Sequence, residues 1–98
     1  MNIPNKLKVA GMTYKVIKNY KFVEANLMGQ CVHTQNLIKL GKYDTHQQEY
    51  NQQKKEECFM HEILHTIDNV YNENKSDEST IDRLSQGLYQ VLNDNKIF

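Results

Sequence analysis

Residues 47–71 contain neither glycine nor proline and carry the clearest helical pattern in the chain. The segment begins at about Gln47 with a run of Gln, Glu and Lys, which tolerate helices well, and we expect residues 47–53 to be the solvated start of a helix. Apolar side chains then recur three or four residues apart, at Phe59, Met60, Ile63, Leu64, Ile67, Val70 and Tyr71. This spacing predicts an amphipathic helix that becomes buried towards its C-terminal half.

A second helix is predicted after the polar break "NENKS" at residues 72–76. Ser76 is a suitable N-cap, and Asp77 and Glu78 would lie in the first turn, where the helix dipole favours acidic side chains. The apolar stripe of this helix fades at "NDNK" and comprises Ile81, Leu84, Leu88, Val91 and Leu92. The C-terminal half of the chain is therefore predicted to be a helix pair.

The N-terminal half has the alternation of β-strands. Apolar residues between positions 7 and 16 alternate with polar ones, which predicts two short strands joined by a turn at Ala10-Gly11. Two further strands are predicted at residues 31–33 and 37–40, with Asn36 in the turn between them. Strands followed by two helices predict an α+β fold, in which a small antiparallel N-terminal sheet packs on the C-terminal helix pair.

Length and charge limit the organisation and the partners of the chain. Ninety-eight residues fit one domain, residues 1–98. Twelve basic and twelve acidic side chains cancel, so no long-range field gathers a polyanion or an anionic membrane. We therefore expect neither a nucleic-acid nor a membrane partner. A neutral total charge is nevertheless compatible with a local basic patch. No signal-peptide or membrane-spanning run occurs, and Cys31 and Cys58 form no CxxC pair, which predicts a cytoplasmic protein.

The helix predicted from residue 47 contains the segment "HEILH", residues 61–65. His61 and His65 are four residues apart, so on a helix both imidazoles project from one face and can bind a single Zn²⁺. Glu62 is rotated by about 100° from His61, at the edge of that face, where its carboxylate can accept a proton from a water activated by the metal. The pattern thus predicts two metal ligands and one general base.

A catalytic zinc site needs a third protein ligand. Asp68 lies on the same helix as the histidines but is better placed to orient an imidazole than to bind the metal. Glu78 and Asp82 are four residues apart on the second helix and share a face that can turn towards the histidines. Helix-hairpin geometry does not decide between them, because Asp82 lies deeper along the pair while Glu78 has the longer side chain.

The segments "HEILHTID" and "DESTIDRLSQGLYQVLND", residues 61–68 and 77–94, resemble the small phage- and mobile-element-borne metallopeptidases related to the ImmA/IrrE family. These are gluzincin-type zincins, with two histidines from HExxH and a glutamate from the next helix. The resemblance implies a minimal zincin-like fold and Glu78 as the third ligand, with Asp82 as its rival. Larger relatives carry a further DNA-binding or regulatory domain that does not match any part of this chain.

The expected function is that of a zinc-dependent metallopeptidase. Zn²⁺ would be held by His61, His65 and Glu78, and Glu62 would act as general base. We expect a peptide or protein substrate to add as a strand along residues 31–40. The alternative is a catalytically inactive, zinc-stabilised interaction module of phage or mobile-element origin that binds a regulatory protein.

Overall fold

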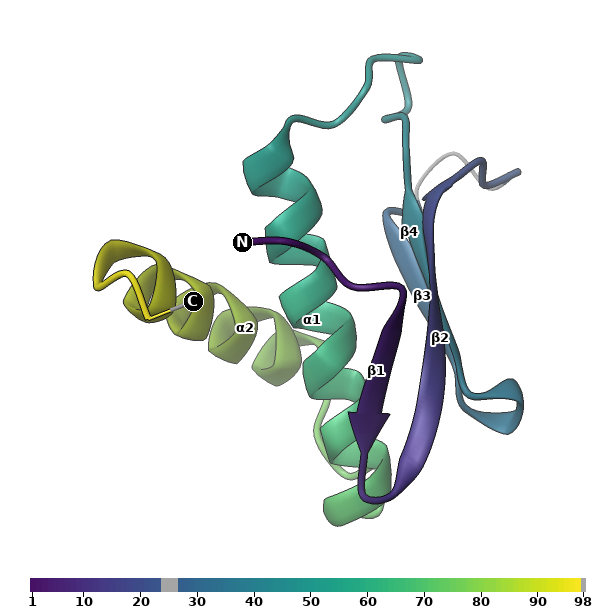
Figure 1. The fold of residues 1–98 in the computed structure, drawn as a ribbon, viewed down its shortest axis with the longest axis vertical. Helices are drawn as coiled ribbons and strands as arrows, with labels where there is room; N and C mark the ends of the chain where they lie inside the picture. The colour runs from purple at the N-terminus through teal and green to yellow at the C-terminus, as the bar shows by residue number, and fades with distance from the viewer. Residues whose placement is uncertain (24–26, 98) are drawn as a thin grey trace.

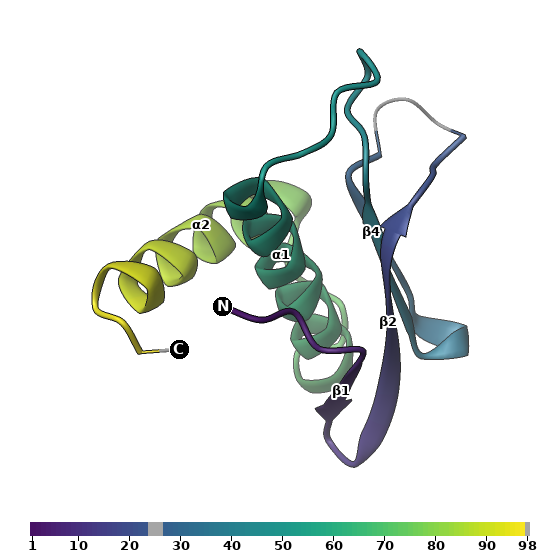
Figure 2. The ribbon, with the colours of Figure 1, turned by 45° about the horizontal axis from the view of Figure 1, so that its top comes forward.

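The computed structural model describes residues 1–23 and 27–97. Its long central helix, α1 (Gln52–Tyr71), lies between a four-stranded sheet and a second helix, α2 (Glu78–Asp94). Figures 1 and 2 show both helices on the same side of the sheet, with α2 crossing α1 on the side away from the strands. The predicted α+β class is confirmed. Within the described residues, neither helix has the length and apolar character that crossing a membrane requires.

The first two strands form the predicted hairpin. β1 (Lys6–Val9) pairs antiparallel with β2 (Met12–Tyr20), and Val9 lies opposite Met12. The connecting residues Ala10 and Gly11 both have positive φ, 50° and 79°. A two-residue turn of this kind matches the right-handed twist of the strands that it joins.

The sheet is mixed, so the prediction of an antiparallel sheet is wrong. β3 (Gly29–Val32) and β4 (Leu37–Gly41) pair antiparallel, but β4 also pairs parallel with β2, and the strand order is β1-β2-β4-β3. The predicted reversal at Asn36 is present, with φ 49°, but His33 belongs to a short 3₁₀ turn and not to a strand. After β2 the chain forms β3 at the edge of the sheet, and β4 then turns back and lies between β3 and β2.

The core lies between the sheet and α1. Alternate residues of β1, β2 and β4 point towards the helix, which is the two-residue period expected of a sheet covered on one face. The buried core cluster consists of Val9, Tyr14, Val16, Ile38, Leu40, Cys58 and Phe59. α1 therefore has a fixed position on the sheet.

The first helix is shorter than predicted at its N-terminus. Residues 47–50 lie outside it, and α1 is capped by Asn51, whose side chain accepts a hydrogen bond from Lys54 N. The preceding turn is stabilised by Asp44 Oδ1, which accepts from the backbone of His46 and Gln48. Such hydrogen bonds between a side chain and the backbone compete with helix formation. They explain why residues 47–50 are not helical although their composition tolerates a helix.

Burial along α1 also differs from the prediction. The helix is most buried in its middle, around Cys58, Phe59 and Met60, whereas Ile67 and Tyr71 near its C-terminus are exposed. Ile67 and Tyr71 therefore lie on a face that points away from the sheet, while Val70 in the same turn still packs against the core cluster.

α2 packs on α1 through a different face from the one its leucines predict. Its N-cap is Asp77, which accepts from Thr80 N, and not Ser76. The buried residues are Ile81, Ser85 and Tyr89, which lie one turn apart. Of the predicted stripe, Leu84, Leu88 and Val91 are exposed. The small Ser85 allows the two helices to approach closely, and the exposed stripe leaves an apolar surface on the outside of α2.

A buried hydrogen bond fastens α2 to α1. Tyr89 Oη donates to Glu56 Oε1 at 2.7 Å, Gln52 donates to the other oxygen, and the amino group of Met1 lies 3.5 Å away. Burial by itself would raise the pKa of Glu56, but these hydrogen bonds and the positive amine more than compensate and lower it. The charged carboxylate is therefore the form that the folded protein stabilises.

Replacing Tyr89 with phenylalanine is expected to destabilise the protein by about 1.5–3 kcal/mol at neutral pH, the usual value of a hydrogen bond to a charged group. Because the folded pKa of Glu56 is lowered, this stabilisation is present above its ordinary value of about 4.3 and is lost as the pH falls through the folded value. Urea unfolding at pH 7 and pH 3 measures both effects.

The matched control is Tyr71→Phe, because the Tyr71 side chain is 68% exposed. We expect its stability to stay within about 0.5 kcal/mol of wild type. A Tyr89→Phe variant that loses as much stability at pH 3 as at pH 7 would show that the hydroxyl group stabilises the protein independently of the charge on Glu56.

Candidate metal centre

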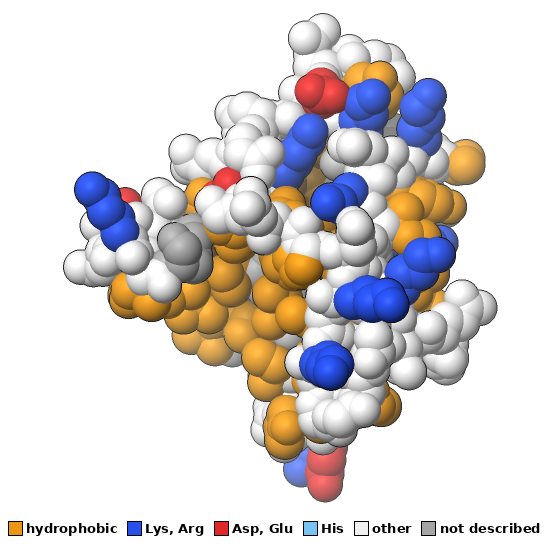
Figure 3. All heavy atoms as spheres, viewed as in Figure 1, with side chains coloured by type: hydrophobic (Ala, Val, Ile, Leu, Met, Phe, Trp, Pro, Cys, Tyr) orange, Lys and Arg blue, Asp and Glu red, His pale blue; other side chains and the backbone are white. Residues whose placement is uncertain are grey.

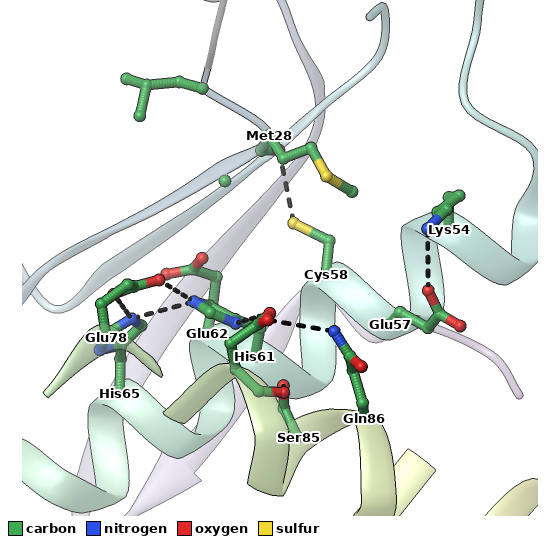
Figure 4. Close-up of a pocket in the computed structure, with 13 residues that line it drawn as sticks. Met28, Lys54, Glu57, Cys58, His61, Glu62, His65, Glu78, Ser85 and Gln86 are labelled. Carbon is green, nitrogen blue, oxygen red and sulfur yellow. Dashed lines mark hydrogen bonds and ion pairs between the residues drawn. The ribbon is translucent and has the colours of Figure 1, made fainter. Parts of the chain in front are cut away.

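His61 and His65 lie one turn apart on α1, and both rings point towards the first residue of α2, Glu78. Figure 4 shows the three side chains meeting at the mouth of a cavity. Glu78 Oε1 is 2.7 Å from His61 Nε2, and Glu78 Oε2 is 2.9 Å from His65 Nε2. The two Nε2 atoms are 3.1 Å apart. The two Nε2 atoms and the Glu78 carboxylate therefore converge, with a different carboxylate oxygen facing each ring.

The turn between the helices brings Glu78 to the histidines. Asp68 Oδ1 accepts hydrogen bonds from Asn72 Nδ2 and from Ser76 N, across the end of α1 and the start of the next segment. These hydrogen bonds, from Asn72 first, lower the pKa of Asp68. The carboxylate thus fixes the helix connection. Its predicted role of orienting an imidazole is not the role that its hydrogen bonds show.

The spacing of the three residues fits a metal ion. Bonds of about 2.0–2.1 Å to a tetrahedral ion place neighbouring ligand atoms about 3.3 Å apart, and the two Nε2 atoms, at 3.1 Å, are close to that separation. Without a cation, each ring can donate its Nε2–H to a different oxygen of the Glu78 carboxylate, at 2.7 and 2.9 Å. His61, His65 and Glu78 could hold a metal ion, their ligand atoms all lying within 4.8 Å of one another.

Asp82 lies on the other side of His61. Its Oδ1 is 3.5 Å from His61 Nδ1, while its Oδ2 accepts from Gln86. Asp82 therefore faces the ring nitrogen that points away from the convergence point. A carboxylate in this position favours the Nδ1–H tautomer of His61 and leaves Nε2 free to bind a metal. Glu78 thus faces Nε2 of His61 and Asp82 faces Nδ1, a difference that the geometry of a helix pair alone does not predict.

Glu62 is buried beside the three residues and is not one of them. Its carboxylate lines a cavity of about 460 Å³, together with the two histidines, Glu78 and Gly29. Burial, and then the negative charge of Glu78, raise the pKa of Glu62 to about 8. A carboxyl group held in this way, next to a metal-binding point, is suited to exchange a proton with whatever occupies the cavity.

β3 passes very close to Glu62. A Cβ on Gly29 would lie 2.6 Å from Cys58 Sγ and 2.9 Å from Glu62 Oε2. Cys58 contacts Met28 O at 3.4 Å, and burial raises the pKa of its thiol to about 12. The thiol is therefore protonated at neutral pH and behaves as a small buried group, as expected for a cysteine outside a reactive site. The only sign of this contact in the sequence is the glycine at position 29, and the alternation of the strands does not indicate why a glycine is needed there.

Cys31 and His33 form a second layer that the sequence did not predict. Cys31 Sγ lies 3.3 Å from both His33 Nδ1 and Thr66 Oγ1. The Thr66 hydroxyl donates to Glu62 O in the preceding turn of α1. Burial, and then nearby His65, lower the pKa of His33 and favour its neutral form. This layer ties the end of β3 to the helix that carries the histidines.

No protein-family model, curated protein or solved structure gives a significant match to this chain. The chemistry of the site therefore has to be derived from its own residues.

Proposed function

We propose that the protein is a zinc-dependent peptidase whose metal is held by His61, His65 and Glu78. The observation that carries this proposal is that three potential ligand atoms converge within 4.8 Å beside a buried carboxylate, Glu62, that is not one of them. A purely structural zinc site has four protein ligands and no need of a base. Three ligands with an adjacent carboxylate are the composition of a hydrolytic site.

Zinc is the metal favoured by the donor set. Two neutral imidazoles and one carboxylate suit Zn²⁺ better than Mg²⁺ or Ca²⁺, which prefer oxygen ligands. Bound Zn²⁺ would supply Lewis acidity and lower the pKa of a coordinated water. Asp82 would keep His61 in the tautomer that presents Nε2.

Glu62 would move the proton. Its carboxylate lines the cavity beside the histidines, next to Gly29 of β3 and Cys58. Burial and Glu78 raise the pKa of Glu62, whereas a bound cation would favour its ionised form, which can accept a proton from the attacking water and return it to the leaving amine. The backbone of α1 fixes its position, because Glu62 directly follows a ligand in the sequence.

The substrate would lie along β3. β4 has partners on both sides, β2 and β3, so of the predicted segment 31–40 only the β3 portion lies at a sheet edge. The start of β3 also borders the cavity, through Met28 and Gly29. An extended peptide that adds to this edge would have its backbone held beside Glu62.

Glu62→Gln tests the proposal. The variant keeps the shape of the side chain and the three ligands but cannot accept a proton. We expect zinc-loaded wild type to cleave a proteome-derived peptide mixture, detected as new termini by mass spectrometry. The variant should keep stoichiometric zinc and lose about 10²- to 10⁴-fold in rate.

Glu73→Gln is the matched control, because the Glu73 side chain is 78% exposed and pairs only with Lys75 among the described residues. It should cleave at the wild-type rate. Cleavage that survives Glu62→Gln would contradict the role of Glu62. Absence of cleavage by the zinc-loaded wild type would contradict the peptidase assignment and favour a zinc-stabilised module that binds a regulatory protein.

A further inference from the structure

The neutral total charge of the chain conceals a strong division along the sequence. Residues 1–43 contain seven lysines and one acidic residue, a net charge of +6. Residues 44–98 contain five basic and eleven acidic residues, a net charge of −6. Because the first segment forms the sheet and the second contains both helices, the division is also one between layers of the molecule.

Four of the lysines point away from the helices. In β1, β2 and β4 the residues that face α1 are Val9, Tyr14, Val16, Ile38 and Leu40, all buried. Their neighbours along the strands project from the opposite face, which puts Lys6, Lys8, Lys15 and Lys39 on it. Both helices cover only the other face (Figures 1 and 2). We call these four residues the lysine face.

The lysine face has no acidic counterpart. Residues 1–23 and 27–43 contain no Asp or Glu at all, and none of the four lysines forms an ion pair with a described residue. Lys6 and Lys15 are directly opposite each other on β1 and β2. Like charges in such a pair are destabilising, so the isolated protein gains nothing from this arrangement.

A pair of aromatic rings lies beside one of these lysines. Lys39 Nζ is 4.6 Å from the centre of the Tyr20 ring, and that ring is 4.8 Å from Phe22 in an edge-to-face arrangement. Tyr20 and Phe22 are both partly exposed. Figure 3 shows blue lysine and arginine side chains gathered over the strands, away from the apolar surface of the helices.

We propose that the lysine face binds single-stranded nucleic acid. A row of cations attracts the phosphate backbone, and exposed aromatic rings provide surfaces on which bases stack. All four cations are lysines, which bind phosphate as compact point charges. A four-stranded sheet is also too broad for the grooves of duplex DNA, which admit a helix or a two-stranded ribbon.

Fluorescence anisotropy with a labelled single-stranded oligonucleotide of about 15 nucleotides tests the proposal. We expect a Kd of about 1–100 μM near physiological salt, the range for contacts to phosphate alone. If all four lysines contact phosphates, log K should fall with log salt with a slope of about −3. The triple variant Lys6→Gln, Lys15→Gln, Lys39→Gln should bind at least about tenfold more weakly and lose about two units of that slope.

The matched control removes the same charge from the helical half: Lys75→Gln, Arg83→Gln, Lys96→Gln. It should change the affinity less than about threefold, because these residues lie away from the lysine face. The proposal is overturned by equal losses in the two triple variants, or by no binding below about 1 mM. It is also overturned if duplex DNA, polyglutamate or phosphatidylserine vesicles bind the wild type as tightly as the single strand does.

A single variant separates binding from folding. Lys6→Glu places an acid opposite Lys15, which should stabilise the sheet and raise the melting temperature by about 1–5 °C. The same change should weaken oligonucleotide binding at least about tenfold, because it replaces attraction to phosphate with repulsion. A variant that gains stability and keeps its affinity would overturn the proposal.

Discussion

Glu78→Ala is expected to weaken zinc binding by about 100- to 1,000-fold. Structural sites with four ligands gain about 10–16 kcal/mol from Zn²⁺, or about 2.5–4 kcal/mol for each ligand. Glu78 contacts both Nε2 atoms, at 2.7 and 2.9 Å, so its removal takes away one ligand in three. Competition with a chromophoric chelator at pH 7 gives the affinity of each variant.

Asp82→Asn is the comparison that makes this result decisive. Asp82 lies 3.5 Å from the other ring nitrogen of His61 and is exposed, so its loss should cost about tenfold or less, at the lower end of the range for residues that support a ligand. Equal zinc affinity in wild type and Glu78→Ala, with a large loss in Asp82→Asn, would reverse the assignment of the third ligand. Thermal unfolding with and without zinc provides an independent readout, since the metal should raise the melting temperature only where the site is intact.

Gly29→Ala is expected to destabilise the protein by about 1–3 kcal/mol, the usual cost of overfilling a packed site. The added methyl group would lie 2.6 Å from Cys58 Sγ, which is held in the core and in contact with Met28 O. Either β3 moves away from α1 or Cys58 changes its rotamer, and both displace the atoms packed beside Glu62. Chemical denaturation measures the loss.

The same substitution at Gly87 should have the opposite sign. Gly87 is exposed on α2, and a Cβ there would meet nothing within 4 Å, so alanine should stabilise the helix by about 0.5–1 kcal/mol. Adding Cys58→Ala to Gly29→Ala should recover part of the lost stability, because it removes the nearest atom. If Gly29→Ala is as stable as wild type, the close approach of β3 to Glu62 is not a constraint of the fold.

Features set by neighbouring residues could be predicted from the sequence. The alternation before Ala10-Gly11 and the four-residue spacing of His61 and His65 predicted the first hairpin and the shared helix face, and both are confirmed. The same spacing placed Glu62 on the helix but could not show that β3 packs against it.

Features set by distant contacts were missed. The parallel pairing of β2 with β4 depends on the path through β3, which no local pattern reports. Of the stripe predicted for α2, Ile81 is buried, but Leu84, Leu88 and Val91 are exposed, because the inward face continues through Ser85 and Tyr89, whose hydroxyl donates to Glu56. The position of Glu78 beside the two histidines depends on the turn that Asp68 stabilises through Ser76, eight residues away in the sequence.

The position of the three proposed ligands within residues 61–78 has a consequence for the order of folding. The ligands His61 and Glu78 are 17 residues apart, and the β2–β4 partners Lys15 and Leu37 are 22 residues apart, so the two contacts close loops of similar length. The β3–β4 partners Val32 and Leu37 are only five residues apart, and local contacts form faster than distant ones in small domains. The β3–β4 hairpin should therefore form first, and the meeting of the ligands and the docking of this hairpin on β2 should follow at similar rates.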